Sequence, residues 1–308
     1  MPSQELRRIL AESGAPGAGA RPAASHGRRD EAEIQEAHVV EGGRFEVYPV
    51  GPPEACPEAV AFLDGAQQHE VLTYTGAVPL VSATVAAAVR ERHGRDLALA
   101  GAQRRHLVVG RAEALDGLPR IPVDVERVEI SEDEPFHPIR DLDTAVAMID
   151  RARRELEVRV GTAFRKRSNA WLIVDGSLAI SPAWAADPRM LSVSKSHATL
   201  PFGGDELRRY LQLPGGHRSS VYQPDTSRLA PVYAWGLRLW PWQGRDLLFG
   251  LVRVEAAPTP ETLVRVDELS RWLLAERAPI SSADARWDRL LYGIHSVEQY
   301  LRAAHLDR

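Results

Sequence analysis

Cysteine is nearly absent from this chain of 308 residues, and long apolar runs are missing altogether. Because Cys56 is the one cysteine, the chain can build neither an internal disulfide framework nor a zinc site made of thiolates. No run approaches the roughly 20 apolar residues of a membrane span, and the first residues lack the continuous apolar segment of a secretion signal. These absences predict a cytoplasmic protein without a membrane anchor.

A strong excess of positive charge is also lacking, since the net charge is −4 and the isoelectric point is near 6.2. The two tight basic runs, 104–105 and 165–167, are interpreted as solvated loops rather than as tracks for DNA. Electrostatic attraction supplies most non-specific affinity for nucleic acids, so this composition favours an enzyme with a charged cleft over a purely electrostatic binder. The chain has neither a Walker A sequence nor a dinucleotide fingerprint, which disfavours a generic sugar or nucleotide hydrolase.

The sequence predicts a short flexible beginning and one long domain. Residues 1–35 are predicted to be a flexible N-terminal segment, with a possible short helix at 4–12 followed by a stretch rich in Gly, Ala, Pro and Ser. Residues 36–308 are predicted to form a single α/β domain. Its clearest helix spans 141–164, and two further helices are expected at 260–276 and at about 284–304.

The stretch Trp171–Leu178 is the centre of the predicted domain. Four apolar residues in a row indicate a strand buried on both faces, and this strand delivers Asp175 into a Gly-Ser turn. Asp-Gly is also ordinary hairpin chemistry. However, the pattern occurs a second time at 59–65, where another apolar strand ends in Asp64-Gly65. If the two strands lie side by side, Asp64 and Asp175 come together.

The segments around these two strands predict their neighbours in the sheet. Residues 70–89 are rich in β-branched and small apolar residues, and they predict two further strands in a meander with the Asp64 strand. Residues 190–197 are predicted to be the hairpin partner of the Asp175 strand, with Lys195 and His197 on one face. Lys195 is interpreted either as a cation for a substrate phosphate or as an exposed hairpin lysine.

A third carboxylate is expected from the helix at 141–164. One face of this helix carries Val146, Ile149, Arg153, Glu157, Val160 and Phe164 at helical spacing, which places Glu157 in the middle of an apolar stripe. Glu155 instead shares a solvated face. An inward carboxylate is costly unless it binds a cation or forms an ion pair, and here the partner of such a pair would be Arg153, one turn back. The sequence leaves both interpretations of Glu157 open.

Carboxylates at Asp64, Glu157 and Asp175 are the ligand type that Mg²⁺ and Mn²⁺ prefer. Bound metal ions of this kind activate water and stabilise the leaving oxygen of a phosphodiester. The sequence therefore predicts a metal site for phosphodiester cleavage where the three elements converge.

These segments together resemble the NurA nuclease family. The resemblance is carried by the Asp64-Gly65 strand, the Tyr74-Thr-Gly-Ala-Val-Pro segment, the helix with its inward glutamate, the Val174-Asp175-Gly-Ser-Leu strand, the Val-Ser-Lys195-Ser-His segment and a C-terminal helix with one histidine, over roughly residues 40–300. It implies a ribonuclease H-like core with a mixed sheet flanked by helices. It also implies Mn²⁺-dependent single-strand endonuclease and 5′-to-3′ exonuclease activity on DNA, a homodimer, and a hexameric HerA-like ATPase as partner.

Carried over residue by residue, the resemblance implies metal ligands at Asp64, Asp175, Glu157 (or Glu155, one register away) and His295. Lys195 joins them as a catalytic residue, and His295 would bind metal, position water or protonate the leaving group. The family's tyrosine falls on Tyr233 or Tyr222, and Trp235, Trp240 and Trp242 are candidates for dimer contacts or for core packing. The alternative function is a catalytically silent scaffold that caps a motor ring, and the pathway, DNA end processing or phage defence, stays open.

Overall fold

The first residues of the chain pack against its body. The computed structural model describes residues 2–12, 33–131, 133, 135–195, 197, 199–225, 230–279 and 287–306. Helix α1 (Pro2–Glu12) buries Leu6 and Leu10 against Leu72 and Leu80. The possible short helix predicted at 4–12 is confirmed as α1, and it packs on the sheet because two leucines one turn apart give it an apolar face to bury. Residues 13–32 of the predicted N-terminal segment lie outside the described residues.

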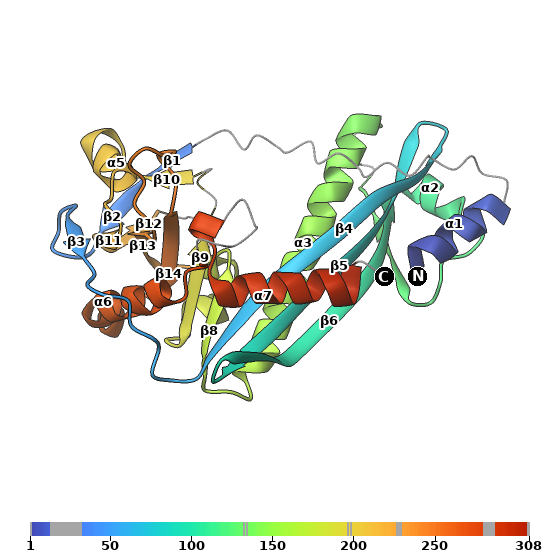
Figure 1. Cartoon of the computed structure of the whole chain (residues 1–308). Coiled ribbons are helices and arrows are strands. Elements are labelled where there is room, and N and C mark those ends of the chain that lie inside the picture. The colour runs from blue at the N-terminus through green and yellow to red at the C-terminus, as the bar shows by residue number, and fades with distance from the viewer. Residues whose placement is uncertain are drawn as a thin grey trace.

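A large mixed sheet runs through the molecule (Figure 1). Within the described residues its neighbouring strands are, in order, β2 (Ala37–Val39), β12 (Tyr222–Pro224), β13 (Tyr233–Arg238), β14 (Leu251–Ala256), β9 (Met190–Ser194), β8 (Trp171–Asp175), β4 (Val60–Thr75), β5 (Val78–His93), β6 (Asp96–Gly110) and β7 (Val125–Glu129). The pairs β4/β8, β8/β9 and β6/β7 are parallel, and the other pairs on this path are antiparallel. Beside this path, β11 (His217–Ser219) pairs with β13 and β3 (Val47–Pro49), and β1 (Glu33–Gln35) pairs with β10 (Thr199–Pro201).

Two predicted strand boundaries are corrected at the centre of this sheet. Strand β4 does not end at Asp64-Gly65 but continues to Thr75, because β5 hydrogen-bonds to it along its whole length. Residues 70–75 therefore belong to β4, and the third strand of the predicted antiparallel meander is β6. The tight turns that join the three strands contain Gly76 and Gly94, both with positive φ.

The relation between β8 and β9 also differs from the prediction. The two strands are parallel rather than a hairpin. The short helices η1 (Leu178–Ile180) and α4 (Pro182–Ala185) lie between them in sequence and carry the chain back to the start of β9. A turn signal such as Asp-Gly does not distinguish a hairpin from such a crossover, since both begin by reversing the chain.

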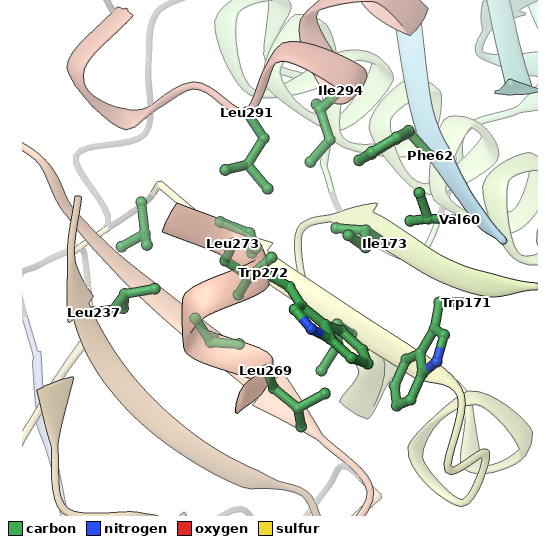
Figure 2. Packing of buried hydrophobic residues seen from close by; sticks show 14 of the residues in the cluster. Val60, Phe62, Trp171, Ile173, Leu237, Leu269, Trp272, Leu273, Leu291 and Ile294 are labelled. Atoms are coloured by element: carbon green, nitrogen blue, oxygen red, sulfur yellow. The ribbon is translucent and has the colours of Figure 1, made fainter. Parts of the chain in front are cut away.

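Helices cover both faces of the central strands (Figure 1). Helix α3 (Pro138–Arg165) packs on one face against Ala61 and Leu63, whereas α7 (Tyr292–Leu301) packs on the other against Phe62. Helix α6 (Pro260–Ala275) lies on the same face as α7, where Trp272 meets Trp171 in an edge-to-face contact (Figure 2). The shorter helices are α2 (Ala112–Asp116), α5 (Gly204–Leu211), η2 (Trp287–Arg289) and η3 (Arg302–Leu306).

The predicted helices at 141–164 and 260–276 are confirmed as α3 and α6, each within a few residues. The last helix, expected from about 284, begins at Tyr292, and residues 284–286 lie outside the described part. Helix α7 approaches β4 closely at Gly293, where an added Cβ would stand 2.4 Å from the ring of Phe62. Among the described residues, no helix is both long and apolar enough to cross a membrane.

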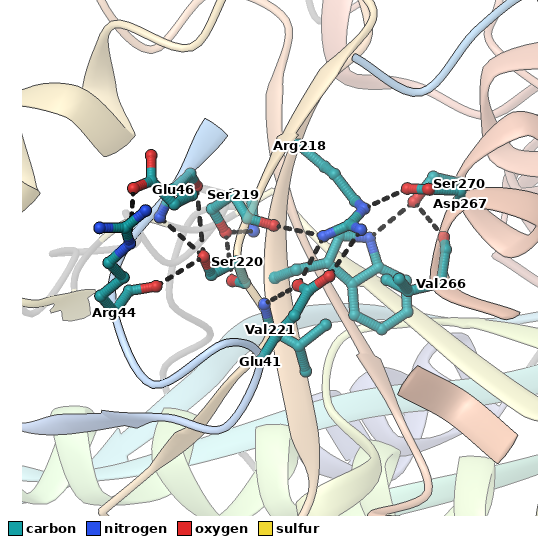
Figure 3. A network of polar contacts seen from close by, with 12 residues as sticks. Glu41, Arg44, Glu46, Arg218, Ser219, Ser220, Val221, Val266, Asp267 and Ser270 are labelled. Atoms are coloured by element: carbon teal, nitrogen blue, oxygen red, sulfur yellow. Dashed lines mark hydrogen bonds and ion pairs between the residues drawn. The ribbon is translucent and has the colours of Figure 1, made fainter. Parts of the chain in front are cut away.

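An ion-pair network centred on the buried Arg218 joins the small strands at one end of the sheet to α6 (Figure 3). The guanidinium of Arg218 donates to both carboxylate oxygens of Glu41, at 2.7 and 2.9 Å, and to Asp267 on α6. Beside it, the indole of Trp235 donates to Ser270 Oγ at 2.9 Å. Trp235 is fully buried, so it is a core residue and not a dimer contact.

Candidate active site

Asp64 and Asp175 stand at the same level of two neighbouring parallel strands. The register of β4 and β8 pairs Val60 with Trp171 and ends with Leu63 opposite Val174, so the next residue on each strand is an aspartate. Asp64 is buried and Asp175 is half-buried. The prediction that the two Asp-Gly strands lie side by side is confirmed. Gly176, with a φ of 118°, then turns the chain away from the sheet.

The third predicted carboxylate comes from α3. Glu157 is only 4% exposed and lies on the buried face of the helix. Its carboxylate occupies the space above Gly65, where an added Cβ would stand 2.0 Å from Glu157 Oε1. Glu157 therefore sits directly beside the Asp64-Gly65 pair, and only glycine at position 65 leaves room for it.

The helical register that places Glu157 inward is confirmed, because Glu155 is exposed and pairs with Arg151 at 3.0 Å. The internal ion pair that was the other interpretation of Glu157 is also present, since Arg153 donates to Glu157. Arg153 donates in addition to Asp150 at 2.8 Å.

Asp64 and Asp175 line an open cleft of about 470 Å³, whereas Glu157 is buried beside Gly65 and is not among the lining residues. Its lining combines acidic and basic groups from β4, β8, α3, the end of β9, η2 and α7: Asp64, Gly65, Arg153, Asp175, Gly176, Ser194, Lys195, Arg289 and Glu298. Lys195 Nζ lies 2.6 Å from Asp175 Oδ2. Lys195 is thus next to the acid cluster, as one of its two interpretations required.

Burial raises the pKa values of two of the three carboxylates. Burial, followed by the negative charge of Asp175, raises the pKa of Asp64 well above its usual range, and the nearby ammonium of Lys195 opposes this shift. Burial likewise raises the pKa of Glu157 to about 7, although the guanidinium of Arg153 works in the opposite direction. A group of acids with raised pKa values in a cleft is typical of a functional site, although structural ion-pair networks also produce such shifts.

The set of acids suits a hard divalent cation, but it is not assembled as a ligand cage. No group of three or more His, Cys, Asp or Glu side chains in the described part of the chain is arranged to hold a metal ion. Two of the three carboxylates are instead paired with Lys195 and Arg153. The features that fit a cation are the close approach of the Glu157 carboxylate to Gly65, next to Asp64, and the repulsion between Asp64 and Asp175, which a cation would relieve.

The remaining predicted site residues, like Glu157, do not line the cleft. His295 is half-buried on α7, one turn before the cleft residue Glu298. Tyr222 is buried in an aromatic cluster with Phe202 and Tyr210, and Tyr233 is half-buried at the start of β13. The structure therefore brings together four of the predicted residues, namely Asp64, Glu157, Asp175 and Lys195.

One supporting residue was missed in the sequence. Glu255 on β14 is buried, and its Oε2 accepts hydrogen bonds from Ser177 Oγ at 2.7 Å, from the Leu178 amide at 2.9 Å and from Ser192 Oγ at 3.2 Å. These bonds fix the turn that follows Asp175. Nothing in its local sequence marks Glu255, because strand β14 meets the turn only through the folded sheet.

Comparison with known proteins was made by sequence and by structure. No protein-family model and no curated protein sequence matches the chain. The structure, however, matches the crystal structure of the NurA nuclease from Sulfolobus solfataricus with a TM-score of 0.52 at 11% sequence identity, over 86% of this chain and 83% of that one. The chain has a NurA-like fold.

Two endonuclease V structures match more weakly. The Ciona intestinalis enzyme in complex with DNA has a TM-score of 0.33 at 10% identity, over 80% of this chain and 84% of that one. The human catalytic domain has a TM-score of 0.31 at 10% identity, over 98% and 96%. Scores this low carry no argument about this protein.

The NurA-like fold agrees with the order of the central strands. An antiparallel meander, β6-β5-β4, continues into the parallel strands β8 and β9, and α3 covers one face. This agrees with the ribonuclease H-like core, a mixed sheet with flanking helices, that the resemblance implied. Asp64 and Asp175 are the first residues after the paired segment of its two central strands, β4 and β8.

Proposed function

We propose that this protein is a divalent-metal-dependent nuclease that cleaves phosphodiester bonds in DNA, with Mn²⁺ or Mg²⁺ as its cofactor. The observation that carries the proposal is the gathering of three acids from two strands and a helix: Asp64 and Asp175 line one open cleft, and Glu157 is buried against Gly65 beside them. The NurA-like fold supports it, since Asp64 and Asp175 lie on the central strands of that fold and Glu157 on the helix that covers them.

Asp64, Asp175 and Glu157 would hold the metal, with His295 as a further proposed ligand or proton donor. A divalent ion bound there supplies an activated water and stabilises the leaving oxygen. Lys195 then acts through its charge. Once Asp175 is engaged elsewhere, the ammonium of Lys195 is available to a phosphate oxygen, where it stabilises developing negative charge.

The finer properties of the proposal follow from the resemblance and from the charge of the chain. We propose single-strand endonuclease and 5′-to-3′ exonuclease activity, a homodimer, and a HerA-like hexameric translocase as partner, in cytoplasmic DNA end processing or phage defence. With a net charge of −4, one subunit has little positive surface to hold a phosphate backbone. A dimer that encloses the strand and sits on a motor ring would retain the DNA by encircling it, so that tight binding of the phosphate backbone is not required.

One observation favours the alternative of a catalytically silent scaffold. Lys195 and Arg153 already neutralise two of the three acids, as in a structural ion-pair network. The third acid, Asp64, argues against this interpretation, because burial and the charge of Asp175 both disfavour its ionised form, and a protein that needs only stability gains nothing from such a carboxylate.

The test is incubation of the purified protein with end-labelled single-stranded DNA, with and without Mn²⁺. We expect cleavage by the wild type only when Mn²⁺ is present. Asp64→Asn and Asp175→Asn should each abolish it, whereas Glu155→Gln, an exposed control on α3, should cleave normally. Cleavage by both asparagine variants at the wild-type rate would show that the acids are not catalytic, and an inactive wild type would favour the scaffold.

A further inference from the structure

Three basic side chains line the cleft, and they differ in how they are paired. Lys195 is held by Asp175, and Arg153 by Glu157 and Asp150. Arg289, in the part of the chain that the structure describes, has only Asp288 as a carboxylate contact, with 3.4 Å between Arg289 Nε and Asp288 Oδ2. That same oxygen accepts a 2.7 Å hydrogen bond from the amide of Gly250, so it is already engaged.

Glu298, the other acid on this side of the cleft, pairs with a different arginine. Glu298 Oε1 accepts a hydrogen bond at 2.7 Å from Arg302, the first residue of η3. The side chain of Arg289 retains 31% of its exposure, and it lines the open cleft together with the acids. Among the described residues, Arg289 is therefore the one cation lining the cleft that is not paired with an acid of the proposed metal site.

The short helix that carries Arg289 is firmly seated. Trp287 makes edge-to-face contacts with Trp240 and Phe249, at centroid distances of 5.6 and 5.5 Å. Asp288 is tied to the Gly250 amide, and Leu290 is fully buried. Arg289 is thus presented to the cleft from an anchored turn, which limits the entropy that its side chain loses on meeting a ligand.

We infer that Arg289 binds a backbone phosphate of the nucleic-acid strand, next to the phosphate that is cleaved. This inference rests on the proposed nuclease function and names how the cleft holds its substrate. A guanidinium presents a planar fork of donors that matches two phosphate oxygens. The cleft otherwise offers a phosphate backbone mainly acids and cations already paired with them, so an uncommitted cation is what a polyanion requires there.

The placement at a flanking phosphate, rather than at the reacting one, follows from the neighbours of each cation. Lys195 contacts Asp175 directly, at the level where Asp64 also lies, whereas Arg289 comes from η2 on the α7 side of the cleft. Contacts to a phosphate that does not react are made equally before and in the transition state. Loss of Arg289 should therefore raise KM and leave kcat nearly unchanged.

The experiment measures kcat and KM on single-stranded DNA in Mn²⁺ over a series of NaCl concentrations. Arg289→Gln should raise KM about tenfold, as expected for one lost charge-assisted contact. The slope of log(kcat/KM) against log[NaCl] should become shallower by about 0.7, the value for one phosphate contact to a single strand. Arg151→Gln, which removes an exposed arginine on the outer face of α3, is the matched control and should change neither quantity.

Arg289→Lys separates charge from folding, because it keeps the positive charge on a long side chain. We expect it to restore the wild-type salt slope while recovering only part of the KM. A salt slope in Arg289→Gln equal to that of the wild type would overturn the inference, as would a loss of kcat that the lysine variant does not repair. A wild type that cleaves no DNA would instead refute the proposed function itself.

Discussion

The buried position of Glu157 makes a specific prediction about how stability depends on pH. Burial raises the pKa of this carboxyl from 4.5 to about 7. A raised pKa means that the folded state binds the proton more tightly than the unfolded state. In the absence of divalent ions, the contribution of Glu157 to stability is therefore greatest at low pH, and it is lost as the pH rises from about 4.5 to about 7.

The size of this loss follows from the shift. About 2.5 pKa units correspond to about 3 kcal/mol, and most of it, about 2.5 kcal/mol, falls between about pH 5 and about pH 8. Because the side chain is only 5% exposed, solvent screening reduces this figure little. Glu157→Gln removes the titration. Relative to the wild type, the variant should gain about 2.5 kcal/mol in unfolding free energy on going from the lower to the higher pH.

Urea denaturation followed by circular dichroism in EDTA at the two pH values measures this difference. Only the change with pH matters, so any pH-independent cost of leaving Arg153 with fewer partners cancels. Glu155→Gln is the control, since Glu155 is exposed on the same helix and should follow the wild-type curve. If the unfolding free energies of Glu157→Gln and the wild type change by the same amount between the two pH values, the Glu157 carboxyl does not have the raised pKa on which this prediction rests.

Two further substitutions test how the acids are positioned. Gly65→Ala should displace the Glu157 carboxylate, since the new Cβ would stand 2.0 Å from Oε1. We expect DNA cleavage to fall at least about tenfold and the unfolding free energy to fall by about 1–3 kcal/mol. A fully active Gly65→Ala variant would contradict this. Glu255→Ala leaves the donors of Ser177, Leu178 and Ser192 without their acceptor, so the unfolding free energy should fall by about 3 kcal/mol. Glu255→Gln keeps one oxygen and should therefore lose less unfolding free energy. Equal losses in the two variants would show that the acceptor does not hold the turn.

The sequence predicted the acids of the site because their signals are local. An apolar run that ends in Asp-Gly marks both Asp64 and Asp175, and helical periodicity separates the inward Glu157 from the outward Glu155. The two strands share this pattern and are parallel neighbours in the sheet, so the aspartate at the end of each apolar run comes to the same level.

The parts that the sequence did not predict depend on contacts between distant segments. Whether β4 stops at Gly65 is decided by β5, which pairs with it beyond that point, and not by the dipeptide itself. The parallel pairing of β8 and β9 depends on a short crossover that resembles a turn. Glu255 and Arg289 reach the site from strands and helices far along the chain, so neither has a local pattern that distinguishes it.

The central claim is that Asp64, Asp175 and Glu157 hold a divalent metal ion. Mn²⁺ binding, measured by electron paramagnetic resonance of the free ion in titrations of the purified protein, tests it most directly. We expect saturable binding by the wild type, a loss of at least about tenfold in affinity for Asp64→Asn and for Asp175→Asn, and unchanged affinity for Glu155→Gln. Equal Mn²⁺ affinity in the wild type and both asparagine variants, or no saturable binding by the wild type, would contradict the account.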